Sequence, residues 1–198
     1  MMFTVIIPYR RKKEYDNFVH LQEVVNSIKQ NAADQAVLIS VFGSMDERVL
    51  ELGVDFLHTF TEEKWNRSKA LNLGVDKADT KFVFTNDADC RWDTNIGIDI
   101  STSLSRNCHV NYRVTMADGT ANLHGAGQQG YSKDWPIRWD ERYVGYGRED
   151  IDMLLQAKKC GLHMIELHGG LMHLSHPRNQ MPDDWANNRQ KFSEKWNS

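Results

Sequence analysis

Residues 81–90 read Lys81-Phe82-Val83-Phe84-Thr85-Asn86-Asp87-Ala88-Asp89-Cys90. The apolar residues at the start of this stretch predict a short buried strand. Asp87 and Asp89 follow it directly, and open α/β sheets bind their ligands at the carboxyl ends of strands. In an extended chain both carboxylates would lie on the same side and repel each other unless a cation lay between them. The pattern therefore predicts either a divalent metal site with oxygen ligands or a solvated acidic turn, since Asn and Asp also favour turns.

Strand and helix patterns alternate before this stretch. We expect strands and helices in turn at residues 3–9, 14–31, 36–42, 46–52 and 54–57. Pro8 is expected to close the first strand, because proline cannot donate a hydrogen bond to a central ladder. Strands that alternate with helices predict an α/β fold, with a mostly parallel, mixed central sheet flanked by helices.

The later part of the chain is expected to complete the same layers. Helices are predicted at residues 68–78, 94–106, 149–160 and 183–196, and strands at 109–116, 163–167 and, as a strand or turn, 169–177. Residues 117–130 are rich in Gly, Asn and Gln and are predicted to be irregular. A long irregular stretch inside a compact domain is often functional.

Length and composition exclude several classes of protein. The 198 residues predict one domain, and the formal net charge of −3 argues against disorder and against a nucleic-acid partner. No apolar run is long enough to span a membrane, and no signal peptide is evident. Cys90, Cys108 and Cys160 form no disulfide pattern. These features favour a reducing compartment, so we expect a cytoplasmic location.

Two basic or aromatic segments are candidates for nucleotide binding. Pro8-Tyr9-Arg10-Arg11-Lys12-Lys13 follows the first strand, and its cations suit the phosphates of a nucleotide. Trp65-Asn66-Arg67 opens a helix, and its indole ring and guanidinium suit a nucleobase and a phosphate. The alternatives are a solvated basic entry to a helix and an ordinary helix cap with a packed tryptophan.

Two further segments carry titratable groups. Gly145-Tyr146-Gly147-Arg148-Glu149-Asp150-Ile151-Asp152 places carboxylates at a helix start, where they complement the helix dipole. One of them could instead be a general base for an acceptor hydroxyl. His173 and His176 are three residues apart, and they are either structural or ligands for a Mn²⁺-like ion.

Taken in chain order, these segments resemble the GT-A fold glycosyltransferases. The resemblance is to family 2 enzymes and to the catalytic parts of β-1,4-galactosyltransferases and chondroitin polymerases, and it covers about residues 4–178. Its most specific part is residues 139–152. This run is similar to the family's Gly-Phe-Asp-Glu…Gly-Trp-Gly-x-Glu-Asp-x-Asp segment.

The resemblance implies a role for each matched residue. Asp150 is implied to be the catalytic base and Glu149 an acceptor-binding carboxylate. Asp89 and His176 are implied metal ligands, joined by His173, which stands where the galactosyltransferases have Met. The residues implied to bind the nucleotide sugar are Pro8, Tyr9, Arg10, Lys12, Trp65, Arg67, Asp87, Ala88, Gly127 and Tyr146. Residues 1–92 are implied to form a nucleotide-binding half, 93–180 an acceptor and catalytic half, and 181–198 a C-terminal helix.

The implied activity is a metal-dependent, inverting glycosyl transfer. The donor would be a UDP-sugar carrying a hexose or N-acetylhexosamine, the cofactor Mn²⁺ or Mg²⁺, and the acceptor a glycan or another hydroxyl. Tyr146 replaces a Trp, Arg148 a small residue and Trp139 a Phe of the family pattern. These departures leave the donor sugar and the acceptor open, and the oligomeric state is open as well.

Two other classes of protein compete with this reading. A nucleotidyltransferase that makes the activated sugar would need a Gly-rich loop after the first strand, and residues 10–13 are not one. A non-catalytic nucleotide- or carbohydrate-binding protein of the same fold would have no need to keep all of Asp87, Asp89, Glu149, Asp150 and His176.

Overall fold

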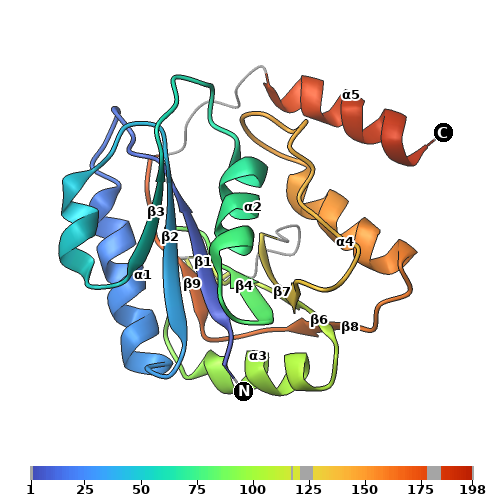
Figure 1. Ribbon diagram of the computed structural model, residues 1–198, viewed down its shortest axis with the longest axis horizontal. Helices are drawn as coiled ribbons and strands as arrows, with labels where there is room; N and C mark the ends of the chain where they lie inside the picture. The colour runs from blue at the N-terminus through green and yellow to red at the C-terminus, as the bar shows by residue number, and fades with distance from the viewer. Residues whose placement is uncertain (1, 117, 121–126, 178–183, 198) are drawn as a thin grey trace.

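The computed structural model describes residues 2–116, 118–120, 127–177 and 184–197 (Figure 1). Within these ranges, seven strands form one sheet in the order β3-β2-β1-β4-β7-β6-β8, and β5 and β9 form a separate pair. The main-sheet strands are β1 (Thr4–Tyr9), β2 (Ala36–Phe42), β3 (Asp55–Thr59), β4 (Phe82–Thr85), β6 (His109–Tyr112), β7 (Gln128–Ser132) and β8 (Met164–Leu167). Four of the six neighbouring pairs are parallel, which confirms the predicted mostly parallel α/β fold.

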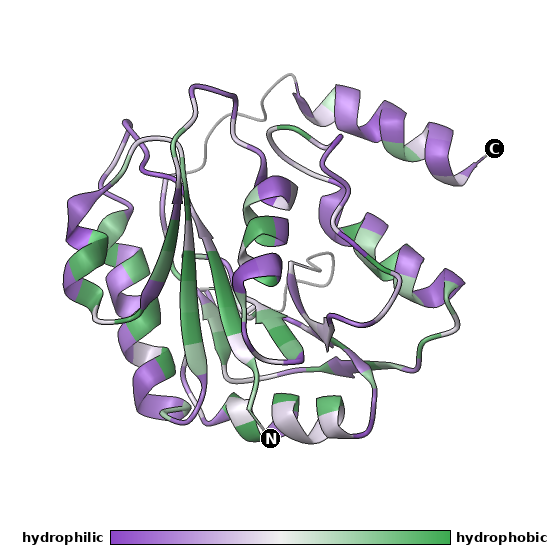
Figure 2. Ribbon diagram, in the orientation of Figure 1, coloured by the Kyte–Doolittle hydropathy of each residue, from purple (hydrophilic) through white to green (hydrophobic). Residues whose placement is uncertain are grey.

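Helices cover both faces of the sheet. They are α1 (Phe18–Asn31), the 3₁₀ helix η1 (Glu47–Leu52), α2 (Arg67–Lys77), α3 (Ile96–Ser105), α4 (Glu149–Lys159) and α5 (Asp184–Trp196). Alternation along β1 directs Val5 and Ile7 into one apolar cluster with α1, η1 and α3. Ile6 points the other way, into a second cluster with α2 and α4. Figure 2 shows these apolar strands at the centre of the molecule.

The first strand differs from the prediction at its end. Pro8 lies inside β1, opposite Ser40 of β2, and does not close the strand. The partner on the other side, β4, pairs with β1 only as far as Ile6. Proline is therefore tolerated in this central strand, because it lies beyond the β4 ladder that its missing N–H would have interrupted.

The first helix also begins later than predicted, at Phe18 instead of residue 14. The side chain of Asn17 closes the preceding loop: its Oδ1 accepts from the Lys12 amide at 3.0 Å, and its Nδ2 donates to the Arg10 carbonyl at 2.9 Å. This loop closure holds the chain outside the helix until Phe18.

Two strands were missed by the sequence prediction. Gln128–Ser132 forms β7 between β4 and β6, although residues 128–130 were predicted to be irregular. Gly130 permits this position, since a Cβ there would lie 3.2 Å from the Phe84 side chain and 3.3 Å from that of Val110. The remainder of the predicted irregular segment includes residues 117 and 121–126, which lie outside the described residues.

The second missed strand is β5 (Cys90–Trp92), which pairs antiparallel with β9 (Leu171–His173). The register places Cys90 opposite His173. This small sheet therefore places residues 171–173 beside the Asp-x-Asp segment.

None of the helices in the described part of the chain combines the length and the apolar character that crossing a membrane requires.

Candidate active site

Asp89 meets both predicted histidines, because the β5–β9 pair brings residues 89 and 173 together. His176 Nε2 lies 3.2 Å from Asp89 Oδ2, and His173 Nε2 lies 3.9 Å from Asp89 Oδ1. One ligand atom from each of the three residues falls within 4.8 Å of the others. Two imidazoles and a carboxylate form a donor set that fits Mn²⁺. The structure thus assembles the predicted metal ligands from segments more than 80 residues apart.

The orientation of His176 suits a ligand. Its Nδ1 lies 3.0 Å from the Pro177 carbonyl. A hydrogen bond from Nδ1 to this carbonyl orients the ring so that Nε2 faces Asp89. The hydrogen bond to Asp89 raises the pKa of His176. Burial acts to raise the pKa of Asp89, but His176, His173 and Lys12 together hold that pKa below its usual value.

Two residues that sequence reasoning did not assign to the site surround His176. The Tyr15 ring stacks on the imidazole, with centroids 5.6 Å apart and planes at 11°. His20, from α1, lies 6.0 Å from His176 between ring centroids. Lys12, predicted to bind the sugar nucleotide, donates to the Tyr15 hydroxyl at 2.7 Å and therefore lies near the predicted metal ligands. Tyr15 had the spacing of an ordinary apolar helix residue, which concealed its position here.

Asp87 has different partners from Asp89, because the chain turns at residues 88–89 instead of staying extended. Arg67 donates to Asp87 Oδ1 from Nε at 2.9 Å and from Nη2 at 2.7 Å. The side-chain amide of Gln128 donates to Asp87 Oδ2 and accepts from its main-chain N–H, both at 2.8 Å. Gln128 was not predicted to be in the site, since its role depends on the unpredicted strand β7.

Gly127, which was predicted to bind the nucleotide sugar, lies against the Arg67–Asp87 pair. Its carbonyl accepts from Arg67 Nη2 at 2.8 Å. A Cβ at this position would lie 2.8 Å from Asp87 Oδ2 and 3.4 Å from Arg67 Nη2. Only glycine lets the chain approach the pair this closely.

Arg67 connects the Asp87 side of the site to the carboxylates of α4. Its side chain is largely buried over the Trp139 ring, 5.1 Å from the centroid, and Nη1 lies 3.9 Å from Glu149 Oε1. Arg67 Nη1 and Glu149 Oε2 are both buried without a hydrogen-bond partner among the described residues. Burial, and then the charge of Asp150, raise the pKa of Glu149 to about 7, although Arg67 acts to lower it.

The two remaining residues of this edge are more accessible. Asp150 follows Glu149 in the first turn of α4 and is half-buried, and its Oδ1 accepts from the Ile151 amide at 2.8 Å. Tyr146 precedes the helix with 60% of its surface exposed. Tyr146 lies three residues before Glu149, and an exposed aromatic ring is a suitable wall for a sugar.

The other residues predicted to bind the nucleotide sugar differ in how deeply they are buried. Tyr9 is 1% exposed and donates from its hydroxyl to Asp46 at 3.1 Å. Pro8 is buried, Arg10 is exposed, and Trp65 is half-buried with its ring edge-on to Phe42. Pro8 and Tyr9 could therefore contact a nucleotide sugar only through their main-chain atoms. Ala88 is half-buried in the turn between the two aspartates.

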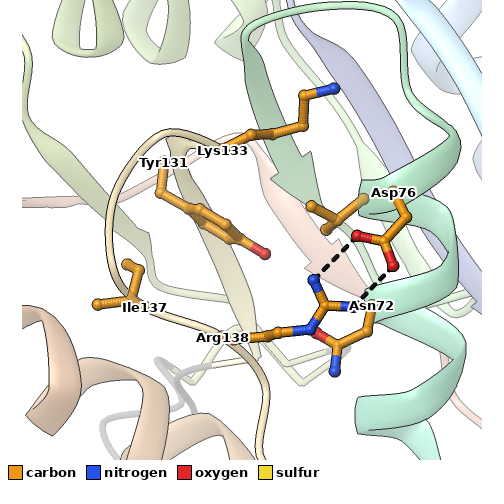
Figure 3. A pocket seen from close by; sticks show the side chains of 7 residues that line it. Asn72, Asp76, Tyr131, Lys133, Ile137 and Arg138 are labelled. Carbon is orange, nitrogen blue, oxygen red and sulfur yellow. Dashed lines mark hydrogen bonds and ion pairs between the residues drawn. The ribbon is translucent and has the colours of Figure 1, made fainter.

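A pocket of about 270 Å³ lies elsewhere, between α2 and the segment after β7 (Figure 3). It is lined by Asn72, Val75, Asp76, Tyr131, Lys133, Ile137 and Arg138, and includes no predicted site residue. Arg138 and Asp76 form an ion pair at its rim. Two lining residues connect the pocket to Trp139, the ring under Arg67. The Tyr131 hydroxyl accepts from Trp139 Nε1 at 2.8 Å, and Asn72 Nδ2 donates to the Trp139 carbonyl at 2.9 Å.

No protein-family model and no curated protein matches the chain by sequence. The fold does match solved structures. Together with the strand order and the cluster at the sheet edge, this match identifies the GT-A fold that the sequence predicted.

The particular structures are those of TarS from S. aureus. One superposes with a TM-score of 0.71 at 14% identity, covering 98% of this chain and 39% of that one. TarS 1–349 in complex with UDP-GlcNAc gives a TM-score of 0.70 over 66% of its length, and the complex with UDP gives 0.66 over 70%. This chain thus spans well under half of the longer TarS structure. At 14% identity, the likeness concerns the fold.

Proposed function

We propose that this chain is the catalytic domain of a metal-dependent, inverting glycosyltransferase that uses a UDP-sugar. The observation that carries the proposal is the position of Arg67, which contacts Asp87 on one side and Glu149 on the other. A donor-binding aspartate and an acceptor-side carboxylate are thereby held in one rigid unit. The binding of UDP-GlcNAc and UDP by TarS, which has the same fold, supports the class of donor.

Asp89, His173 and His176 would hold the metal ion. The mixed nitrogen and oxygen donor set favours Mn²⁺, with Mg²⁺ as the alternative. A divalent ion at this position would neutralise charge on the leaving diphosphate.

The chain's own residues perform the other steps. Lys12 and Arg10 add positive charge on the diphosphate side. Asp150 takes the proton from the acceptor hydroxyl, which attacks the anomeric carbon from the face opposite the diphosphate. Glu149 binds the acceptor, and Tyr146 forms a wall of the sugar pocket. The acceptor would be a glycan or another hydroxyl compound.

The same proposal assigns donor binding to residues 1–92 and acceptor binding to residues 93–180, followed by a C-terminal helix. The two halves share side chains at the site. Gln128 and Gly127 from the second half contact Asp87 and Arg67, and His176 contacts Asp89. The donor site would therefore form only when both halves are folded.

The test is a thermal-shift screen of UDP and UDP-sugars with and without Mn²⁺, followed by donor hydrolysis. Binding of UDP with Mn²⁺ should raise the melting temperature, and the Asp89→Ala variant should lose the Mn²⁺ dependence. A nucleotidyltransferase would instead form UDP-sugar from UTP and a sugar phosphate. A binding protein would show the thermal shift without any turnover, and the absence of UDP binding would refute the proposal.

A further inference from the structure

The loop of residues 144–148, directly before Glu149 and Asp150, has an unusual backbone. Gly145, Gly147 and Arg148 have φ values of +81°, +98° and +80°. Arg148 is one of two non-glycine residues with a positive φ in the described part of the chain, and it is the N-cap residue directly before α4. A left-handed arginine is unfavourable by itself, so contacts from elsewhere must hold it in place.

The C-terminal helix α5 supplies a hydrogen-bonding contact to this loop. Asn188 is 1% exposed, and its side-chain amide donates to the Val144 carbonyl at 2.9 Å and to the Tyr146 carbonyl at 3.2 Å. One buried side chain therefore fixes two loop carbonyls that lie on either side of Gly145.

The same helix also lies in direct van der Waals contact with the loop. A Cβ on Gly145 would clash with the Asp184 side chain, and a Cβ on Gly147 would lie 3.0 Å from Trp185 Cδ1. The guanidinium of Arg148 lies 5.8 Å from the Trp185 ring centroid and 5.4 Å from that of Phe192. The strained residue is thus held by cation–π contacts to two rings of α5.

The far end of α5 holds α4 just beyond the two carboxylates. Asp152 is fully buried and accepts from Trp196 Nε1 at 2.7 Å, and it forms an ion pair with Lys195 at 2.8 Å. Figure 1 shows α5 beside the loop that precedes α4. The helix therefore contacts the chain on both sides of Glu149 and Asp150.

The opposite side of the loop rests on the donor-binding segment. The Gly145 amide donates to the Trp65 carbonyl at 2.7 Å, and Asn66 and Gly145 form an isolated β-bridge. The loop is therefore held between the segment that starts α2 and helix α5.

We propose that α5 is a clamp that sets the position of Glu149 and Asp150, with Asn188 as its positioning residue. The inference rests on the proposed function for the consequence to turnover, but the clamp itself is a property of the fold. Without the two Asn188 hydrogen bonds, the loop relaxes and displaces the carboxylates from the acceptor side. The contacts of Asp87 with Arg67 and of Asp89 with His176 do not involve α5, so UDP binding should change much less than turnover.

The experiment compares Asn188→Ala with Asn187→Ala, an exposed asparagine on the same helix. In Asn188→Ala, hydrogen exchange of peptides covering residues 143–150 should accelerate, while peptides from β1 and β2 stay unchanged. The affinity for UDP with Mn²⁺, measured by calorimetry, should stay within about twofold, while hydrolysis of UDP-GlcNAc should fall by about 10- to 100-fold. Asn187→Ala should match the wild type in every measurement.

Unchanged exchange in residues 143–150, or unchanged hydrolysis despite faster exchange, overturns the clamp. If the wild type fails to bind UDP, the proposed function is refuted, and exchange alone decides the clamp. If Asn188→Ala does not fold, Arg148→Gly replaces it, since glycine relieves the backbone strain while removing the contacts to Trp185 and Phe192. The clamp predicts faster exchange and lower hydrolysis in that variant, and wild-type behaviour would overturn it.

Discussion

Two regions of this molecule are stabilised by different forces: one part of the central sheet, and the loop before α4 with α4 and α5. In the β3-β2-β1-β4 part, β1 is buried along its whole length, and Ile7 lies opposite Ile39 with both side chains fully buried. Where the loop before α4, α4 and α5 meet, the buried groups include polar and charged side chains. Asp152 and Asn188 are 0% and 1% exposed, and both act through hydrogen bonds.

This difference separates stability from geometry. Apolar burial is non-directional and scales with area, so the first part supplies much of the folding free energy. Hydrogen bonds are directional, and a buried polar group requires its partner. The second part therefore fixes where the carboxylates lie, and substitutions in the two parts should have different consequences.

The largest effect should come from Asp150→Asn, because an amide cannot act as the general base. We expect transfer to fall by about a thousandfold or more, while UDP affinity and melting temperature stay close to wild type. Initial rates and calorimetry measure the two quantities. Asp99→Asn, on an exposed position of α3, is the control. Near-normal transfer by Asp150→Asn would refute the base assignment.

In the apolar part, Ile7→Ala should lower the free energy of unfolding by about 3 kcal/mol, since it leaves a cavity between β1 and its neighbours. Urea denaturation gives this quantity. Ile98→Ala is the matched control, because Ile98 is 62% exposed, and it should be almost neutral. Equal costs in the two variants would contradict the assignment of the core.

Glu149→Gln should make the protein more stable at pH 8, at the expense of activity. The folded-state pKa of Glu149 is raised to about 7, whereas a free glutamate titrates near 4.5. Its contribution to stability is therefore complete below pH 4.5 and is lost as the pH rises to 7. Removing the buried charge should increase the free energy of unfolding by about 1 to 3 kcal/mol at pH 8 and by little at pH 4.

Urea denaturation at both pH values checks this prediction. Glu51→Gln, at an exposed position, should change neither value. A loss of stability at pH 8 would mean that the contact with Arg67 outweighs the burial of Glu149.

The smallest effect should come from the ion pair at the rim of the pocket in Figure 3. Arg138 and Asp76 are 2.7 Å apart at their closest atoms, but both side chains are 55% exposed. A double-mutant cycle with Arg138→Ala and Asp76→Ala should give a coupling energy of about 0 to 1 kcal/mol, decreasing with salt. A much larger coupling would show that an exposed charge pair contributes as strongly as the buried network of α4 and α5.

The apolar part was largely predictable, because strand burial leaves a direct pattern in the sequence. Residues 36–42 and 82–85 are mostly apolar runs and were predicted as strands. The polar part was less predictable. Gln128–Ser132 has no hydrophobic alternation, and it forms a strand because β4 and β6 lie on both sides of it.

The candidate site divides in the same way. Asp87, Asp89, Arg67, Glu149 and the two histidines could be selected from residue type and order along the chain. Gln128, Tyr15, His20 and Asn188 could not, because each acts through a partner that is distant in sequence. For Asn188, the partners are the carbonyls of residues 144 and 146, and a carbonyl leaves no signal in the sequence.

The sequence by itself determined the α/β layering and the chemical groups available to the site, since both follow from local hydrophobic pattern and side-chain type. The tertiary structure decided which groups meet. The turn at residues 88–89 separates Asp87, which pairs with Arg67, from Asp89, which meets the histidines through the β5–β9 pairing. Helix α5 determines how the loop before Glu149 and Asp150 is held. These outcomes depend on distances between remote segments, which only the packed sheet and its helices fix.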